Sequence, residues 1–295
     1  MLVTLGTLAI ERPDGSPVAR LLDQPKRFAV LLYLLFSRRG GSVSRDRIVG
    51  VFWPDADTTR ARNALRQTLS FIRGCLGEKA VVGVGAHGLS AGSSLDCDAL
   101  RFEALLDAGR REEALELYGG EFLPGFHISG SALFAAWVDG RRLHLSQRAA
   151  KAAWDLSSEH EARGALQGAA FWGKRALALS PFSESEVQRL VQLLGRVGDY
   201  TEALRAFHGL RQSLQAEFGA VPSAETARLI AELKARYESE GQQQPALVGT
   251  RRSGLDRRMA RRRVARGRWI GAERRVQHDR RMGERRSRQD RREMH

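Results

Sequence analysis

Residues 58–76 read TTRARNALRQTLSFIRGCL, and this stretch decides how the amino-terminal part of the chain folds. At about 100° per residue, five of its apolar residues fall on one narrow stripe: Ala61, Leu65, Leu69, Ile72 and Leu76. The pattern predicts an amphipathic helix, capped by Asp57, whose apolar side faces a core. The opposite side collects Thr59, Asn63, Arg66, Gln67 and Ser70, with Arg60, Arg62 and Arg73 on its flanks.

The polar side of this helix has two interpretations. It is either an ordinary solvated face or a surface that reads a nucleic-acid groove. No acid lies between Asp57 and Glu78, and amide and hydroxyl side chains alternate with arginines. Arg pairs with guanine edges, Asn or Gln pairs with adenine edges, and flanking arginines neutralise phosphates. The composition therefore favours contact with DNA.

Residues before this helix predict a hairpin and two shorter helices. The first ten residues alternate like a strand with a slip at Gly6, and Asp14-Gly15 then supplies a turn from which residues 18–21 return as a partner strand. Apolar residues at helical spacing over 28–35, followed by a basic turn and Gly40, predict a helix. Ser44 caps a further helix that ends at Trp53-Pro54.

Residues after the long helix predict a second hairpin and then a helical region. Residues 80–84 and 88–91 read as strands joined by a turn at Ala86-His87, and residues 92–94 read as a linker. From Asp98 onward every segment is helical, up to a last helix capped by Ser223 that runs to about residue 238. The fold class expected is mostly α. An amino-terminal α+β domain has the order hairpin, helix, helix, long helix, hairpin, and an all-α region follows it.

The helical region repeats the spacing Gly-x4-Ala. It occurs at Gly109, Gly164 and Gly198, and the last two lie 34 residues apart, which is the period of a tetratricopeptide repeat (TPR). Small residues allow two antiparallel helices to approach closely. A TPR-like array is therefore predicted, with consensus-like positions at Leu156, Gly164, Ala169, Ala176 and Pro181, and then at Leu190, Gly198, Ala203 and Phe207.

Most of the net charge of +14 lies at the carboxyl end of the 295 residues. Residues 250–295 hold 18 Arg and 6 acids, which is +12 of the total. Few large apolar residues occur after Gln242, so residues 241–295 are predicted to be a disordered Arg-rich tail. Two roles stay open for it, a solvating tail or nonspecific binding to nucleic-acid phosphate.

Several classes of function find no support in the sequence. The longest apolar run, residues 28–36, is far shorter than the roughly 20 residues of a membrane-spanning helix, and no basic leader is present, so a cytoplasmic location is expected. The two cysteines, Cys75 and Cys97, and the seven histidines show no metal-ligand spacing. Residues 83–88 spell G-x-G-x-x-G but do not open a helix, as a dinucleotide site requires. No cofactor, metal or catalytic site is predicted, and the protein is not expected to be an enzyme.

Several motifs in consistent order resemble the SARP family of bacterial transcriptional activators. Residues 1–91 resemble its winged-helix DNA-binding domain, and residues 98–240 resemble the bacterial transcriptional activator domain. The motifs are FAVLL at 28–32, SRD at 44–46 with FWP at 52–54, ARNAL at 61–65, GEFLPGF at 120–126, Trp137 with RRL at 141–143, residues 198–204 and residues 214–222.

This resemblance implies a regulator that binds direct repeats in double-stranded promoter DNA, usually as a dimer, and recruits RNA polymerase at the bacterial nucleoid. It assigns Asn63, Arg66, Gln67 and Ser70 to base edges, and Thr59, Arg60, Arg62 and Arg73 to phosphates. His87, at the tip of the wing, is either a DNA contact or a surface turn residue, and the turn around it carries no Arg or Lys. No membrane contact is implied.

A different class of function also fits the helical region. Trp137, Trp154, Trp172 and Phe207 sit at helical spacings and are interpreted as packing residues rather than as a ligand cage. Repeat arrays nevertheless present concave surfaces to partner proteins. The alternative to a transcription factor is therefore a TPR-like scaffold without sequence-specific DNA binding.

Overall fold

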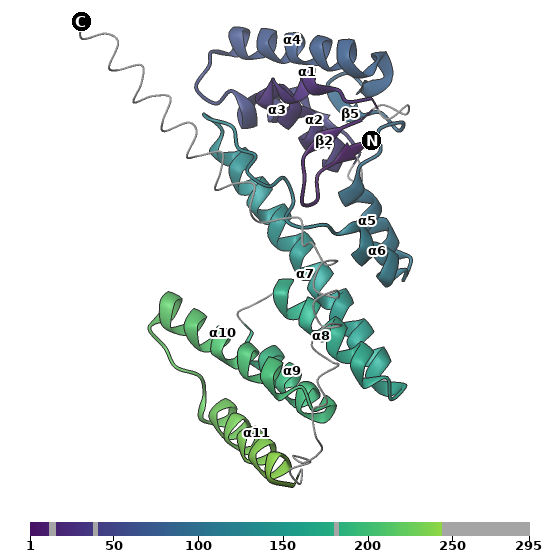
Figure 1. The fold of residues 1–295 in the computed structure, drawn as a ribbon. Coiled ribbons are helices and arrows are strands. Elements are labelled where there is room, and N and C mark those ends of the chain that lie inside the picture. The colour runs from purple at the N-terminus through teal and green to yellow at the C-terminus, as the bar shows by residue number, and fades with distance from the viewer. Residues whose placement is uncertain (12–15, 38–40, 180–182, 244–295) are drawn as a thin grey trace, which may run out of the picture. The chain divides into compact units, whose positions relative to one another are not determined.

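The computed structural model describes residues 1–11, 16–37, 41–179 and 183–243, and it is mostly α-helical (Figure 1). The predicted Arg-rich tail from residue 244 onward lies outside the described residues, as do Asp14-Gly15, Gly40 and Pro181. The elements before residue 97 are β1 (Leu2–Val3), β2 (Ala9–Ile10), α1 (Ala19–Leu22), α2 (Pro25–Ser37), β3 (Val43–Ser44), α3 (Arg45–Phe52), α4 (Thr58–Leu76), a 3₁₀ turn (Glu78–Ala80), β4 (Val81–Val84) and β5 (Gly88–Ala91).

The amino-terminal domain is built around α2, which is buried along most of its length. Helices α1, α3 and α4 contact α2, and a three-stranded antiparallel sheet of order β3-β5-β4 completes the winged helix. Ser44 caps α3 and Asp57 caps α4. Each side chain accepts a hydrogen bond from the backbone amide three residues further along the chain. The predicted bounds of α4 are confirmed, and strand β3 was not foreseen because it spans only two residues.

The predicted amino-terminal hairpin pairs differently from the expectation. Its strands are β1 and β2, in antiparallel register with Leu2 opposite Ile10, so the chain turns back within the first ten residues. Gly6 makes this turn possible because its φ is +79°, a conformation that residues with a Cβ rarely adopt. The chain does return beside Ile10, since Glu11 and Pro17 form an antiparallel bridge and the Val18 amide donates to the Ile10 carbonyl at 2.8 Å. The predicted strand over 18–21 is wrong beyond Val18, because Ala19–Leu22 form α1, which contacts α2 and α4.

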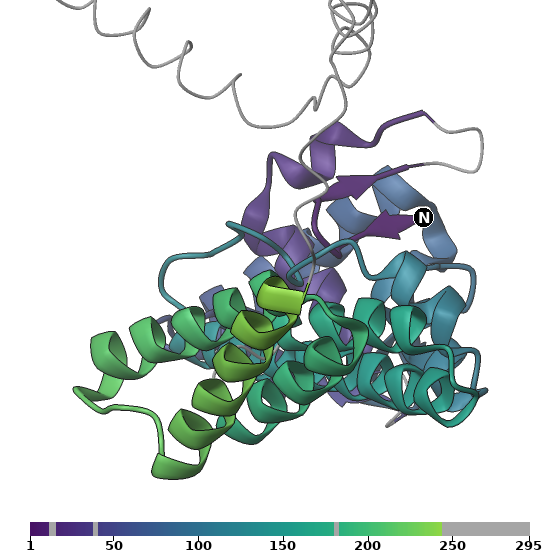
Figure 2. The same cartoon turned by 60° about the horizontal axis from the view of Figure 1, so that its bottom comes forward.

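The carboxyl-terminal part is a series of antiparallel helices (Figures 1 and 2). Each helix from α5 to α10 contacts the next one along the chain. They are α5 (Asp98–Asp107), α6 (Arg111–Leu117), α7 (Ala132–Ala162), α8 (Leu166–Leu179), α9 (Glu184–Val197), α10 (Tyr200–Phe218) and α11 (Ala224–Gln243).

The Gly-x4-Ala spacing marks the tight turns of this series. Gly109, Gly164 and Gly198 all have φ between +73° and +81° at the connections between helices. The alanine five residues after each glycine, at positions 114, 169 and 203, is fully buried in the next helix. The glycine lets the chain reverse, and the methyl group lets the second helix lie close to the first.

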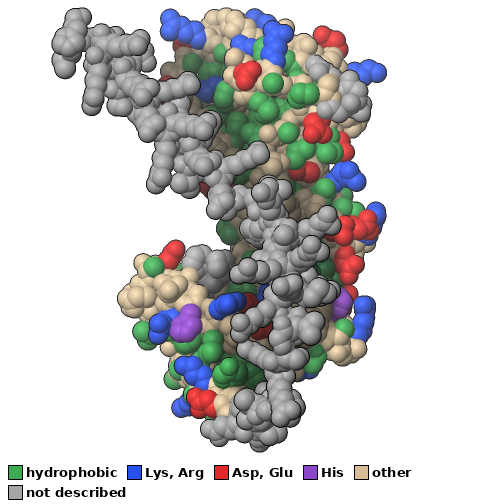
Figure 3. Space-filling view, viewed as in Figure 1, with side chains coloured by type: hydrophobic (Ala, Val, Ile, Leu, Met, Phe, Trp, Pro, Cys, Tyr) green, Lys and Arg blue, Asp and Glu red, His purple; other side chains and the backbone are tan. Residues whose placement is uncertain are grey.

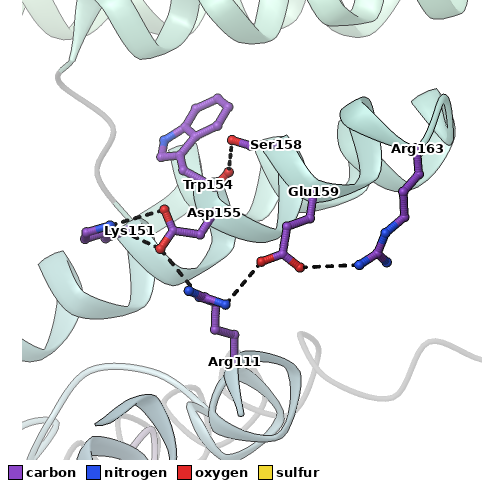
Figure 4. Close-up of polar contacts among 7 residues, drawn as sticks. All are labelled: Arg111, Lys151, Trp154, Asp155, Ser158, Glu159 and Arg163. Atoms are coloured by element: carbon purple, nitrogen blue, oxygen red, sulfur yellow. Dashed lines mark hydrogen bonds and ion pairs between the residues drawn. The ribbon is translucent and has the colours of Figure 1, made fainter. Parts of the chain in front are cut away.

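Helix α7 belongs to both parts of the chain. Its first turns pack into the winged-helix domain, where the Phe134 ring lies 5.2 Å from that of Phe52 and the Trp137 ring lies 5.5 Å from that of Tyr33. Its later turns pack against α8. On its surface, Arg111 of α6 bridges Asp155 and Glu159 of α7 at 3.5 and 3.1 Å (Figure 4). Because α7 packs against both parts, the buried hydrophobic residues form one continuous core from β1 to α11.

The junction near residue 97 is tied to the amino terminus rather than free. The Leu2 amide donates to the Asp96 carbonyl at 2.8 Å, and the Gly92 amide donates to the Ala80 carbonyl at 2.9 Å. The buried Asp98 carboxylate accepts from the amides of Thr4 and Leu5 and from the Thr4 hydroxyl. The glycine and serines predicted as a linker thus lie between two anchored segments.

Candidate nucleic-acid interface

Helix α4 presents the polar side that its sequence predicts. Ala61, Leu65, Leu69 and Ile72 are buried, and the short side chain of Thr68 joins them. On the other side, the predicted contact residues that the structure leaves exposed are Thr59, Arg60, Arg62, Asn63, Arg66, Gln67 and Ser70. Figure 3 shows Lys and Arg side chains along the edge of the molecule where α4 lies. The helix is thus held by its apolar stripe and open to a partner along its polar side.

The exposed arginines are oriented by short-range polar contacts. Arg66 donates from Nη1 to Oδ1 of Asn63 at 2.9 Å, which joins two of the predicted base-reading residues. Arg62 pairs with Asp46 of α3 at 3.2 Å, and Arg60 pairs with Asp57 at 3.2 Å. All these groups are more than half exposed, so each ion pair is weak and its arginine can turn to a phosphate at little cost.

Arg73 has a structural role that the sequence did not reveal. Its Nε and Nη2 atoms donate to the carbonyl oxygen of Val81 at 3.1 and 2.9 Å, and its side chain is half-buried. Two of its donors therefore fasten α4 to the first strand of the wing. Its predicted phosphate contact stays a prediction.

The wing lies beside α4 and is fixed to the start of α3. His87 is exposed at the tip of the β4–β5 turn, and its carbonyl accepts from the amide of Arg45 at 3.1 Å. The Arg45 guanidinium also donates to the Ala86 carbonyl at 3.3 Å. The G-x-G-x-x-G residues form this hairpin and open no helix.

A hollow of about 610 Å³ lies between α4, the start of α3 and the wing. It brings together five of the predicted residues, Arg62, Arg66, Ser70, Arg73 and His87, with Thr59, Arg60, Asn63 and Gln67 outside its lining. Arg45 also lines it, and this residue was not among the predicted contacts because no spacing in the sequence connects the start of α3 with the wing. Asp46 and Glu78 are the acids in the lining, and the rest is basic, polar or apolar.

Residues 97–234 match the protein family described as bacterial transcriptional activator domain (BTAD). The chain carries a BTAD. Helices α5 to α10 and the first turns of α11 lie within the matched residues, so the BTAD is the helical series that shares its core with the winged helix. This match agrees with the resemblance to the SARP family that the sequence motifs carry.

A solved structure resembles the fold of most of the chain. It is titled "Mycobacterium tuberculosis EmbR in complex with low affinity phosphopeptide", with 19% sequence identity and a TM-score of 0.51. The match covers 79% of this chain and 64% of that one, so the BTAD chain spans less than two thirds of the length of EmbR. The likeness confirms the fold class of a winged helix followed by a helical domain. No curated protein matches the chain.

The described residues contain neither a metal site nor a membrane span. In the part of the chain that the structure describes, no three His, Cys, Asp or Glu residues lie close enough together to hold a metal ion. None of the described helices is both long and apolar enough to cross a bilayer. Trp137, Trp154 and Trp172 lie in helix interfaces, where rings or cations cover them.

Proposed function

We propose that this chain is a DNA-binding transcriptional regulator, an activator that reads promoter DNA through α4 and its wing. The observation that carries the proposal is the exposed polar side of α4, on which amides, a hydroxyl and arginines lie over a fully packed apolar stripe. The BTAD that follows supports the assignment to transcription.

The geometry of α4 suits insertion into the major groove. Asn63, Arg66, Gln67 and Ser70 project from one side, where an arginine can donate two bonds to guanine and an amide can both donate to and accept from adenine. The Arg66–Asn63 bond keeps the two side chains together before they meet a base pair. Arg60 and Arg62 lie toward the flanks, where phosphates run, and Thr59 precedes them at the helix start.

The proposed role of the BTAD, contact with partner proteins, is supported by the core that it shares with the winged helix. A protein that binds direct repeats places its copies side by side in one orientation, and the packing of α7 fixes how each BTAD stands on its winged helix. The proposed partners are a second copy of the chain on the adjacent repeat and RNA polymerase. The proposed place of action is the nucleoid in the bacterial cytoplasm.

Selection of sites from a random DNA library by the full chain tests this function. We expect enrichment of a repeated motif, and we expect Arg66→Ala or Asn63→Ala to cost about 1 to 3 kcal/mol for the selected site by loss of a base contact. Binding to scrambled DNA should change far less. Lys234→Ala on α11 is the control, because Lys234 lies in the last helix of the BTAD.

The alternative function is a protein-interaction scaffold. A hollow of about 340 Å³ among α8, α9 and α10 favours it, because its lining is mainly apolar, with Leu177, Leu190 and Leu210 contributing. A wild-type chain that enriches no sequence from the library would favour the scaffold. If the wild type discriminates and both α4 variants still do, α4 is not the reading helix.

A further inference from the structure

A second basic surface lies on the side of α4 that faces away from the wing. A hollow of about 260 Å³ separates α4 from the start of α2, and Lys26, Arg27, Trp53 and Gln67 are among its lining residues. Gln67 is one of the predicted base-reading residues, so this surface borders the interface directly. None of its cations belongs to the contacts predicted from the sequence.

Aromatic rings hold these cations next to α4. The Arg27 guanidinium lies 4.2 Å from the centre of the Phe71 ring, and that of Arg20 lies 5.2 Å from the same ring. The Lys26 ammonium lies 5.9 Å from the centre of the Trp53 ring. A ring face attracts a cation without neutralising its charge, so the three groups keep their full positive charge at fixed positions. Within the described residues, no carboxylate forms an ion pair with any of them.

The two flanks of α4 carry matching charge. Phe71 follows Arg62 by nine residues, which at about 100° per residue places the two on opposite sides of the helix. The Arg62 side meets Arg45 and the wing, and the Phe71 side meets Arg20, Lys26 and Arg27. A helix in the major groove, about 12 Å wide, lies between the phosphates of both strands. Arg60 precedes Phe71 by eleven residues and so lies on the same flank, where Arg20, Lys26 and Arg27 add to its charge.

We propose that Arg20, Lys26 and Arg27 form a second phosphate-binding site, which grips the DNA backbone on the side of α4 opposite the wing. This inference rests on the proposed function and adds the residues that hold the other strand. The ligand is the phosphodiester group, so the contacts add affinity equally for every sequence. The rings of Phe71 and Trp53 position the cations and do not touch DNA themselves.

The salt dependence of binding by the full chain tests this site. Each neutralised phosphate contributes about 0.9 to the slope of the logarithm of the binding constant against the logarithm of salt concentration. We expect Lys26→Ala and Arg27→Gln each to flatten this slope by about 1 and to weaken selected and scrambled DNA by the same factor. Arg27→Lys should restore the slope because it keeps the charge.

Matched controls are Lys234→Ala and Arg228→Ala, which remove exposed cations from α11 and should leave the slope unchanged. The exposed Arg20→Ala variant serves as a test that does not disturb packing, and thermal unfolding checks that each variant is folded. If the wild type discriminates among sequences but the folded Arg20, Lys26 and Arg27 variants keep the wild-type salt slope, the second phosphate-binding site is overturned and the proposed function stands. A wild type that discriminates among none overturns the proposed function instead.

Discussion

At the scale of single residues, Asp98 shows how a charge is used inside this protein. Its side chain is 4% exposed, and its oxygens accept from the amides of Thr4, Leu5 and Ala99 and from the Thr4 hydroxyl, at 2.6 to 2.9 Å. A buried carboxylate is tolerated when donors surround it in this way. The donors come from both sides of the junction, so Asp98 links the first strand to the BTAD.

Replacing Asp98 by Asn should therefore destabilise the protein by about 1 to 3 kcal/mol, since an amide cannot accept from all of these donors and leaves buried N–H groups unpaired. The midpoint of urea unfolding measures the loss. Asp155→Asn is the control, because it breaks only part-exposed ion pairs with Lys151 and Arg111 and should cost less than about 1 kcal/mol. Equal losses for the two variants would contradict the role given to Asp98.

The neighbouring Cys97 should be unreactive in the folded protein. Burial, together with the charge of Asp98, raises the pKa of its thiol to about 12, against the partial opposing effect of the Thr4 hydrogen bond. At pH 8 only about one thiol in ten thousand is then ionised. We expect iodoacetamide to label the half-buried Cys75 first and Cys97 only after unfolding. Rapid labelling of Cys97 in the native chain would show that this site is open.

The raised pKa of the Cys97 thiol should also make the stability of the protein depend on pH in the alkaline range. The folded state keeps the Cys97 proton above the usual thiol pKa near 9, while the unfolded state releases it. The free energy of unfolding should therefore hold below pH 9 and fall as the pH rises toward about 12. Cys97→Ala should lose less stability over this range than the wild type does, as measured by urea unfolding at several pH values.

At the scale of elements, prediction from sequence worked where one pattern dominated. The long helix at 58–76 has its cap, Asp57, directly before it and its apolar stripe within its own residues, and the structure confirms its bounds. The wing strands followed equally from local turn chemistry. The returning strand predicted at 18–21 gives way to α1 after Val18. The sequence Val-Ala-Arg-Leu fits either a strand or a short helix, and only contact with α2 and α4 decides between them.

The candidate site was predictable only in part for a similar reason. The polar side of α4 follows from helical periodicity, whereas the cations of α1, α2 and α3 reach the interface through tertiary packing. Arg45 lies beside the wing turn, and Arg27 lies over Phe71. In each case about forty residues of sequence separate the arginine from its partner. No spacing rule connects residues so distant in sequence. Arg73 shows the converse, since its position on the helix gave no sign of its bonds to Val81.

The turn glycines give an element-scale prediction. Gly198 ends α9 with φ +81°, so Gly198→Ala should lower stability by about 1 kcal/mol. Gly209→Ala is the matched substitution inside α10, where an added methyl would meet no atom within 4 Å, and it should raise stability by up to about 1 kcal/mol. Thermal unfolding distinguishes the two signs. A stabilising Gly198→Ala would argue against the tight α9–α10 connection.

At the scale of the whole molecule, the continuous core means that the winged helix and the BTAD should unfold together. The Trp137 ring of α7 contacts Tyr33 and Phe36 of α2 as well as Phe122, so it belongs to both. We expect Trp137→Ala to lower the stability of the entire described chain by about 3 kcal/mol and to keep a single transition. Phe171→Ala removes a ring that is 56% exposed on α8 and should change little. Two separate transitions in the wild type would contradict a shared core.

Helix α7 also sets a limit on how such proteins can be recombined. Its first turns supply Phe134 and Trp137 to the aromatic cluster, and Arg142 holds the backbone of residues 122–123 by donating to both carbonyls. A chimera joined between the wing and residue 97 would separate the winged-helix domain from these side chains. The apolar surface that they cover would then be exposed to solvent. A chimera that keeps all residues through 142 would retain the side chains that cover this surface. Crossover points in natural or engineered domain exchanges should therefore lie in the middle of α7.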